Sequence, residues 1–439
     1  MGGGTPGPSI CNEAGGPMTK SATAAEAVLA RLDGIRGWQE DCYRDLHRHP
    51  ELSHHEVRTA GVIAERLGHD GYRVHDKIGG TGVVGVLENG SGPTVLLRAD
   101  MDALPVREAT GLDYASTVSS ADADGHEVPV MHACGHDVHV TALLGAAQLL
   151  AEGRDHWNGT LVALFQPAEE SADGARAMVR DGLASVLPAV DVALGQHVFP
   201  IPAGIIGTHS GPFLASADSM RITVYGRGAH GSMPQSSVDP VVLAAMIVIR
   251  LQTIVSREVA PVDSVVLTVG SIESGNKSNV IPDRAVLQLN IRTYGEQTRT
   301  TVLDAIRRIV TAECMASGCP REPEFEMFGR FPLTDNDPGA TARVREAFTA
   351  FFGDRCMDMP QGAASEDFSE IPVALGAPYT YWGVGGTDPA AFRQAMESGR
   401  VEQDIPVNHS PHYAPVIQPT LDAATQAMVV AALAWLAAA

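Results

Sequence analysis

Residues 131–139 carry three imidazoles, one thiol and one carboxylate, so this short run is dense in groups that can bind a metal. Cys134 and His136 are two positions apart, which is too close for one face of a helix, where neighbours lie three or four residues apart. The two side chains can therefore converge only in a turn, and Gly135 permits such a turn. We expect a metal-capable pair in a loop, where functional residues are common.

Asp137 is suited to cap the apolar helical pattern that follows it, at residues 138–150. Taken alone, the segment also fits a structural cysteine with hydrogen-bonded histidines. A zinc ribbon is disfavoured because the chain contains no C-x-x-C motif. A metal site would need further carboxylates or imidazoles from elsewhere, the usual partners of Zn, Mn, Co or Ni.

Three other apolar segments have the continuous hydrophobicity of strands buried on both faces of a parallel or mixed sheet. Each one delivers acids or a histidine at its end, where ligands usually bind in open α/β sheets. These residues are Asp100, Asp102, Glu169, Glu170 and His197. Asp102 alone could equally be a helix cap or a turn residue. Together, the three strand ends predict one shared cleft.

Five side chains could supply one thiolate, three imidazoles and one carboxylate, namely Cys134, His136, Glu170, His197 and His409. That set suffices for two divalent cations, which can polarise a carbonyl and make hydroxide available near neutral pH. Hydrolysis is the natural outcome. Glu169 could then take the proton of the water and pass it to a leaving amine, provided that it stays off the metal.

The hydrophobic pattern predicts an α/β fold in which the catalytic metal-binding domain is discontinuous, with its sheet mixed. Residues 24–214 and 329–439 form this domain, after a disordered leader at 1–23. Residues 215–328 change to a β-α-β-β-α order, which fits an inserted α+β sandwich with helices on one face of an antiparallel sheet. Within the first segment, Asn89-Gly90 indicates a hairpin.

The net charge of −21 argues against nucleic-acid binding, which needs a basic face. Six irregularly spaced cysteines suit reduced thiols in a cytoplasmic protein better than a disulfide framework. We expect no membrane association, because no run of about 20 uninterrupted apolar residues and no signal peptide is apparent.

Seven motifs are spread over the chain: RADMDALP at 98–105, HACGHD at 132–137, QPAEE at 166–170, GQH at 195–197, GAHG at 228–231, NVIP at 279–282 and NHSP at 408–411. As a set they resemble the M20 metallopeptidase family. The closest branch comprises amidohydrolases that cleave N-acyl amino acids, such as hippurate hydrolase, indole-acetyl-amino-acid hydrolase and N-acyl-amino-acid aminoacylase. The likeness extends from about residue 40 to the end.

The resemblance implies a zinc-peptidase-like catalytic domain with two divalent ions per subunit, Zn or Mn with Co or Ni as alternatives. The implied metal ligands are Cys134, His136, Glu170, His197 and His409. Glu169 would be the general base, and Asp102 would hold a ligand imidazole in position. The expected substrate is a small N-acyl-L-amino acid, which is hydrolysed to a carboxylic acid and a free amino acid.

The resemblance also implies that the inserted domain is ferredoxin-like and forms a homodimer, which could pair further into a tetramer. His230 and Asn279 would reach the cleft of the partner subunit and stabilise the tetrahedral oxyanion. Arg292 would bind the carboxylate of the substrate. Gln235 stands where relatives often carry a second histidine, which leaves the substrate range open. Two rivals are a dipeptidase or aminopeptidase of the same family and a non-catalytic metal-binding protein.

Overall fold

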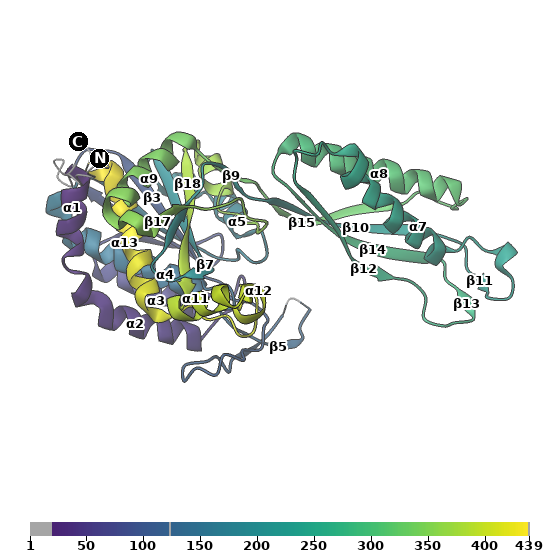
Figure 1. Ribbon diagram of the computed structural model, residues 1–439, viewed down its shortest axis with the longest axis horizontal. Coiled ribbons are helices and arrows are strands. Elements are labelled where there is room, and N and C mark those ends of the chain that lie inside the picture. The colour runs from purple at the N-terminus through teal and green to yellow at the C-terminus, as the bar shows by residue number, and fades with distance from the viewer. Residues whose placement is uncertain (1–19, 123, 438–439) are drawn as a thin grey trace, which may run out of the picture.

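The computed structural model describes residues 20–122 and 124–437, and it contains two bodies built on separate sheets (Figure 1). The larger body is built on an eight-stranded mixed sheet. In order across the sheet, its strands are β1 (Arg73–Ile78), β2 (Gly82–Asn89), β6 (Gly159–Gln166), β3 (Thr94–Asp100), β7 (Val192–Pro202), β18 (Tyr379–Thr387), β8 (Ile206–Thr208) and β17 (Cys356–Asp358).

The central strands of this sheet run parallel and are buried on both faces. β3 pairs in parallel with β6 and β7, and β18 pairs in parallel with β7. All seven residues of β3 are buried, including Arg98 and Asp100 as well as the apolar run from Val95 to Leu97. The carboxyl ends of β3, β6 and β7 therefore meet at one edge of the sheet.

The hairpin expected at Asn89-Gly90 is wrong. β2 pairs with β6, which lies between β2 and β3, so the strands on either side of this turn are not neighbours. The side chain of Asn89 instead donates to the carbonyls of Arg154 and Trp157, just before β6. Asn89 therefore contacts the loop that leads into β6, and this contact cannot be read from the residues around the turn.

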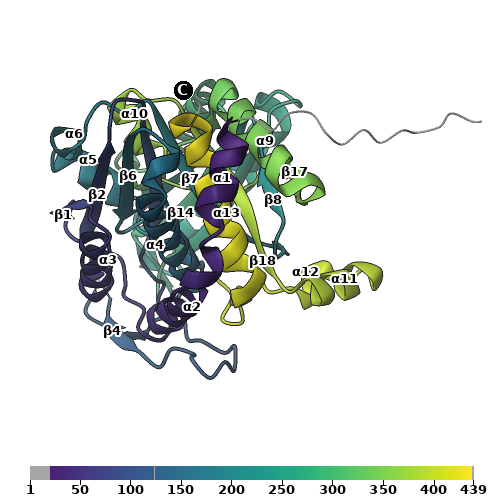
Figure 2. The same cartoon turned by 90° about the vertical axis from the view of Figure 1, so that its left-hand side faces the viewer.

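Helices cover both faces of the large sheet (Figure 2). One core contains side chains from α1 (Lys20–Leu29), α2 (Leu32–Arg48), α3 (Val57–His69), α4 (His136–Glu152), α9 (Pro338–Phe352) and α13 (Ile417–Leu436). The opposite core contains side chains from α5 (Gly174–Arg180), α6 (Leu183–Val186) and α10 (Glu370–Leu375). Two short helices, α11 (Pro389–Glu397) and α12 (Val401–Asp404), follow β18, and the small β4–β5 pair (Ser119–Ala121 and Glu127–Pro129) precedes α4.

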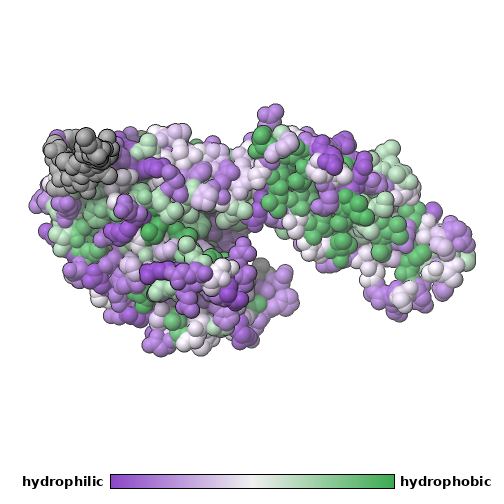
Figure 3. Space-filling model, viewed as in Figure 1, coloured by the Kyte–Doolittle hydropathy of each residue, from purple (hydrophilic) through white to green (hydrophobic). Residues whose placement is uncertain are grey.

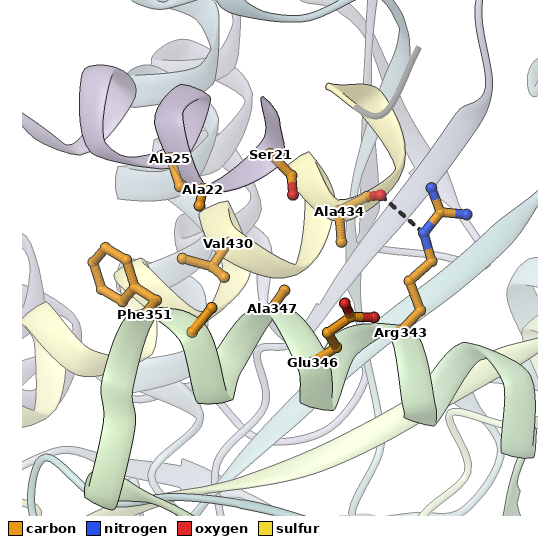
Figure 4. Close-up of a pocket in the computed structure, with 10 residues that line it drawn as sticks. Ser21, Ala22, Ala25, Arg343, Glu346, Ala347, Phe351, Val430 and Ala434 are labelled. Atoms are coloured by element: carbon orange, nitrogen blue, oxygen red, sulfur yellow. Dashed lines mark hydrogen bonds between the residues drawn. The ribbon is translucent and has the colours of Figure 1, made fainter. Parts of the chain in front are cut away.

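Residues 20–23, which the sequence analysis placed in the leader, form the first turn of α1. Residues 1–19 lie outside the described residues. α1 packs against α13 and α9, and a cavity of about 210 Å³ lies between these three helices (Figure 4). Alanines line much of it, and the Arg343 guanidinium donates to the carbonyl of Ala434 at one end.

The smaller body is a four-stranded antiparallel sheet with two helices on one face. Its strands, in order, are β12 (Val265–Glu273), β14 (Arg284–Thr293), β10 (Ser216–Tyr225) and β15 (Glu324–Phe331). Its helices are α7 (Pro240–Thr253), which continues into a π turn over Ile254–Glu258, and α8 (Glu296–Ala316). β15 was not predicted, and its sequence, EFEMFGRF, mixes charged residues and a glycine with the apolar ones.

Two short pairs of strands mark the ends of the smaller body. β9 (Gly211–Leu214) pairs with β16 (Thr334–Asn336) where the chain passes between the bodies. β11 (Ala229–His230) pairs with β13 (Val280–Ile281) at the end farthest from the large sheet (Figure 1). The smaller body thus extends away from the larger one.

Two helices of the described chain are long and apolar enough to cross a membrane, which the sequence analysis did not anticipate. They are Pro240–Glu258 and Ile417–Leu436. The second is α13, most of which is buried in the core of the large body, so its apolar character is explained by packing. Only 33% of the apolar window of the first helix is buried, and its remaining residues are exposed or half-buried.

Leu433→Ala tests how much the central helix α13 contributes to stability. Leu433 is fully buried, so truncation should lower the free energy of unfolding by about 2–5 kcal/mol, the usual cost of a cavity in a core. Denaturant titration followed by circular dichroism measures the change. Met396→Ala, at an exposed position on α11, should change stability by less than about 0.5 kcal/mol. Equal losses in the two variants would contradict this account.

Candidate metal centre and active site

The residues expected to bind metal come together at the carboxyl edge of the large sheet. The ligand atoms of Cys134, His136 and His197 lie within 4.8 Å of one another. Those of Cys134, Glu170 and His409 satisfy the same limit. The two groups share the Cys134 thiol, so the five side chains are arranged as two neighbouring triplets with one sulfur in common.

Gly135 makes the turn between Cys134 and His136 possible. Its φ is 83°, and a Cβ at this position would lie 2.5 Å from Cγ1 of Val198. α4 begins directly at His136, so the expectation that Asp137 caps the helix is wrong. Asp137 lies inside the first turn, where its carboxylate accepts hydrogen bonds from the His47 ring and from the backbone N–H of Val138.

Main-chain carbonyls fix the orientation of two of the ligand imidazoles. Nδ1 of His136 donates to the carbonyl of Asp102 over 2.9 Å, and Nδ1 of His197 donates to the carbonyl of Val198 over 2.8 Å. Their Nε2 atoms are therefore free to act as ligands, and that of His197 lies 3.5 Å from Sγ of Cys134. The Asp102 carboxylate was expected to hold a ligand imidazole. Its Oδ1 lies 3.3 Å from Nδ1 of His136, farther away than the main-chain carbonyl oxygen of Asp102.

Several buried polar atoms of the cluster have no hydrogen-bond partner within the described chain. They include Nε2 of His136, Oε1 of Glu170 and Oδ1 of Asp102. Buried polar groups are nearly always paired, so unpaired atoms in a native structure point to a missing ligand. Imidazole, thiolate and carboxylate are the donors that zinc and its neighbours among the transition metals accept. The residues present therefore fit a pair of divalent cations.

His139 and Asp100 are buried next to the metal-ligand residues and help to position them. Nε2 of His139 accepts from the backbone N–H of Val198, so Nδ1 carries the proton and donates to Oδ1 of Asp100 over 2.5 Å. Asp100 also accepts from the buried Arg98 guanidinium over 2.7 Å. Burial would raise the pKa of Asp100, but Arg98 and His136 hold it well below its usual range. The sequence analysis gave neither Arg98 nor Asp100 a role of its own.

Asn408 is a further residue at the site to which no role was assigned. Its side-chain amide donates to the carbonyl of Cys134 over 3.1 Å and to that of Val198 over 3.3 Å. The adjacent His409 has a φ of 69°, an uncommon conformation for a side chain other than glycine. The signals for Asn408 in the sequence were its place beside a candidate ligand and its membership of the NHSP motif. Asn408 thus ties the segment that carries His409 to the other ligands.

Glu169 is buried beside the cluster, with Oε2 3.9 Å from Nε2 of His136. Burial, and then the neighbouring carboxylates Glu366 and Glu170, raise its pKa well above the ordinary value. A carboxylate whose pKa is raised toward neutrality is suited to accept and return a proton. Cations bound to the adjacent ligands would oppose this shift.

The three remaining predicted residues lie outside the cluster, on the smaller body. Arg292, on β14, donates from Nη1 to the carbonyl of Ala363 and to Oγ of Ser365, which belongs to the larger body. His230 and Asn279 are exposed neighbours at the far end, where the N–H of Gly231 donates to the carbonyl of Asn279. Within one chain, His230 and Asn279 are therefore far from the ligands (Figure 1).

His132 is buried beside the cluster, and both of its ring nitrogens lack a hydrogen-bond partner within the described residues. Burial lowers its pKa to about 4, so the ring is neutral.

Metal binding by this cluster should release protons. Burial and the nearby Glu170 raise the pKa of the Cys134 thiol, and the close approach of Cys134 and Glu170 raises the pKa of His409 to about 10. A bound cation needs the thiolate and the neutral imidazole, so affinity should increase with pH. Between about pH 6.5 and about pH 7.5, Zn²⁺ affinity measured against a chromogenic chelator should rise by roughly 10-fold for each proton released.

Cys134→Ser should weaken this binding by about 100-fold or more and flatten its pH dependence. Cys356→Ser, which changes a thiol outside the site, is the matched control and should leave both unchanged. Affinity that is independent of pH in the wild type would contradict the assignment of these ligands.

Comparison with known proteins identifies relatives over most of the chain. The family model for peptidase family M20/M25/M40 matches residues 96–405. N-acetylcysteine deacetylase from Bacillus subtilis is 36% identical over 83% of this chain and 91% of its own length, and hippurate hydrolase from Campylobacter jejuni is 38% identical over 78% and 86%. Thermostable carboxypeptidase 1 from Saccharolobus solfataricus is 37% identical over 80% and 86%.

Solved structures agree with this assignment. A putative aminohydrolase from methicillin-resistant Staphylococcus aureus superposes with a TM-score of 0.81 at 30% identity, covering 94% of this chain and 100% of that one. A dinuclear metal binding peptidase of the M20 family from Bacillus subtilis gives 0.71 at 30% identity, covering 93% and 98%. The chain therefore belongs to peptidase family M20/M25/M40.

Proposed function

We propose that this protein is a binuclear metalloamidohydrolase that cleaves N-acyl-L-amino acids, or related amide conjugates, to a carboxylic acid and a free amino acid. The observation that carries the proposal is the pair of ligand triplets that share Cys134, with the buried carboxylate of Glu169 beside them. The relatives named as an N-acetylcysteine deacetylase and a hippurate hydrolase act on substrates of this class.

Cys134, His136, Glu170, His197 and His409 would hold two divalent cations, for which zinc or manganese suits the donors best and cobalt or nickel would also serve. Bound there, the cations would polarise the amide carbonyl and lower the pKa of water. The carbonyls of Asp102 and Val198 keep the imidazoles in the tautomer that presents Nε2. The protein thereby supplies a preformed set of ligands.

Glu169 is the general base in this proposal. Its carboxylate is buried next to the ligands. Glu169 and Glu170 both group with His136, whereas Glu170 also groups with Cys134 and His409. Glu169 takes a proton from the attacking water and delivers it to the nitrogen of the leaving amino acid, so that the C–N bond breaks to give a neutral amine. Of the two consecutive acids, Glu170 would bind metal and Glu169 would transfer the proton.

Arg292 would bind the carboxylate of the amino-acid portion. Its Nε donates to Oδ1 of Asn290 and its Nη1 to Ala363 and Ser365, which leaves Nη2 for a ligand within the described structure. A fixed guanidinium suits recognition of a carboxylate. The same feature would suit a carboxypeptidase, the activity named for one relative at 37% identity, so cleavage of peptides is the second candidate.

Glu169→Gln should lower kcat by about 10²–10⁴-fold, because the amide cannot accept the proton, while the metal content per chain stays at the wild-type level. The assay is release of free amino acid from N-acetyl and N-benzoyl amino acids after reconstitution with Zn, Mn, Co or Ni. Glu152→Gln, at an exposed acid at the end of α4, should behave as the wild type.

Dipeptides with free and with blocked amino termini separate the two candidates. Preference for the free amine would favour a dipeptidase or aminopeptidase, and release of the last residue from N-blocked tripeptides and tetrapeptides would favour a carboxypeptidase. An acylamino-acid hydrolase would instead prefer simple N-acyl amino acids. A wild-type protein that binds two metals but cleaves nothing in either panel would overturn the proposal.

We also propose that the smaller body forms a homodimer. Exposed apolar side chains gather on one face of α7, at Val241, Val242, Met246 and Ile249, and Figure 3 shows hydrophobic surface over this body. β12 beside it is an edge strand, which can pair with another chain. A dimer would cover this face and could carry the distant His230 to the cleft of a partner.

Ile249→Arg should convert the dimer to a monomer, because Ile249 is 67% exposed on α7 and a buried arginine would lack a partner. Light scattering after size-exclusion chromatography measures the mass. Val373→Arg is matched in exposure, at 69%, but lies on α10 of the larger body and should not change the mass. A monomeric wild type would refute the dimer.

A further inference from the structure

The turn that follows β6 holds an uncommon backbone conformation. Ala168 and Ala172 have φ values of 52° and 60°, and neither is a glycine. Gly174 closes the turn so tightly that a Cβ would lie 1.7 Å from the carbonyl oxygen of Pro167. Such conformations cost about 1–3 kcal/mol each and persist only where surrounding contacts hold them. Glu169 lies inside this turn, so those contacts determine where its carboxylate points.

Glu56 supplies one of these contacts from a distant part of the sequence. It precedes α3, and its side chain is completely buried. Oε1 accepts from the backbone N–H of Ala168 over 2.8 Å and from that of His54 over 3.0 Å. Oε2 accepts from Oγ1 of Thr81 over 2.6 Å. Three donors from three segments therefore converge on this carboxylate.

Asp102 provides the matching contact on the other side of Glu169. Its Oδ2 accepts from the backbone N–H of Glu170 over 3.0 Å and from Oγ of Ser53 over 2.7 Å. The N–H groups of the residues before and after Glu169 are thus each held by a buried carboxylate. With both neighbours fixed, the backbone sets the direction in which the Glu169 side chain leaves the chain.

We propose that Glu56 is a positioning residue for the hydrolytic reaction: its carboxylate holds the strained backbone at Ala168 and thereby aims Glu169 at the metal cluster. This inference rests on the proposed function, because it takes Glu169 as the general base. A capping role for Glu56 alone does not account for the contacts, since its oxygens bind Ala168 and Thr81 instead of the first N–H groups of α3.

The chain offers a matched control in Glu51. Its carboxylate accepts from the backbone N–H groups of Arg58 and Thr59 and so caps the same helix, α3, without touching the turn. Glu51→Ala should therefore destabilise α3 and leave the turn in place. Comparison of Glu56→Ala with Glu51→Ala separates positioning of the turn from support of the helix.

The first readout is kinetic, with both metals at saturation and metal content measured per chain. Glu56→Ala should lower kcat by about 10–100-fold with KM changed by less than about 3-fold, because a displacement of the base near 1 Å suffices for such a loss. Glu56→Gln keeps an acceptor for Ala168, and the Thr81 hydroxyl can rotate to accept from the new amide. This variant should therefore retain kcat within about 3-fold of the wild type.

The second readout needs neither substrate nor metal. In the metal-free protein, amide exchange measured by mass spectrometry over residues 166–174 should be at least about 10-fold faster in Glu56→Ala than in the wild type. In Glu51→Ala, faster exchange should be confined to α3. Glu56→Asp withdraws the carboxylate by one methylene and replaces Glu56→Ala in both readouts if the alanine variant does not fold.

Equal behaviour of Glu56→Ala and Glu51→Ala would overturn the inference, and so would loss of kcat in Glu56→Gln as large as in Glu56→Ala. Absence of wild-type turnover would count against the proposed function instead, while the exchange comparison would still decide whether Glu56 holds the turn.

Discussion

A fully buried guanidinium makes the acidic interior of this active site possible. Arg98 is completely covered and donates to Gln166, Asp100, Glu366 and Asp367. Uncompensated charges cost several kcal/mol each when buried, and removal of one partner from a buried pair typically costs about 3–5 kcal/mol. Arg98 holds the pKa of Asp100 well below its usual range, whereas burial and the neighbouring Glu366 raise the pKa of Asp367 well above it.

The same charge network orders the ligands. Arg98 fixes Asp100, Asp100 holds the Nδ1–H of His139, and Nε2 of His139 receives the N–H of Val198, next to His197. Each step has a single donor and a single acceptor, so the tautomer of His139 follows from its neighbours. The partners of metal ligands are often as important as the ligands. Here they reach from β3 through α4 to β7.

Structural features that are determined by residues close together in the sequence were predicted better than features that depend on distant contacts. The carboxyl ends of parallel strands meet at one edge, so the apolar runs before Asp100, Glu169 and His197 sufficed to predict a shared cleft. Asn89-Gly90 and Asp137 misled because their local preferences are common, while the observed pairing of β6 and the start of α4 at His136 depend on tertiary packing.

The residues that position the ligands and the general base were harder to predict than the ligands themselves. Asn408 meets Cys134 across 274 positions, and Glu56 meets Ala168 across 112. Such contacts have no periodicity and no characteristic spacing. The residue type alone therefore predicts neither partner of the contact well. Ligands stand out because few side chains bind metals, whereas acids and amides that accept or donate one backbone hydrogen bond are common in any chain.

The two bodies meet through the segment that also carries part of the charge network. Tyr294 and Arg292 of the smaller body donate to Gly362, Ala363 and Ser365. The next residue, Glu366, binds Arg98 and accepts from the hydroxyl of Tyr381 in the core of the larger body. Ala363, which accepts from Arg292, lies only three positions before Glu366, and Glu366 is the charged neighbour that most raises the pKa of Glu169. The side chain suited to bind the substrate carboxylate and the side chain suited to move the proton are thus linked by one short segment, whose two ends belong to different bodies.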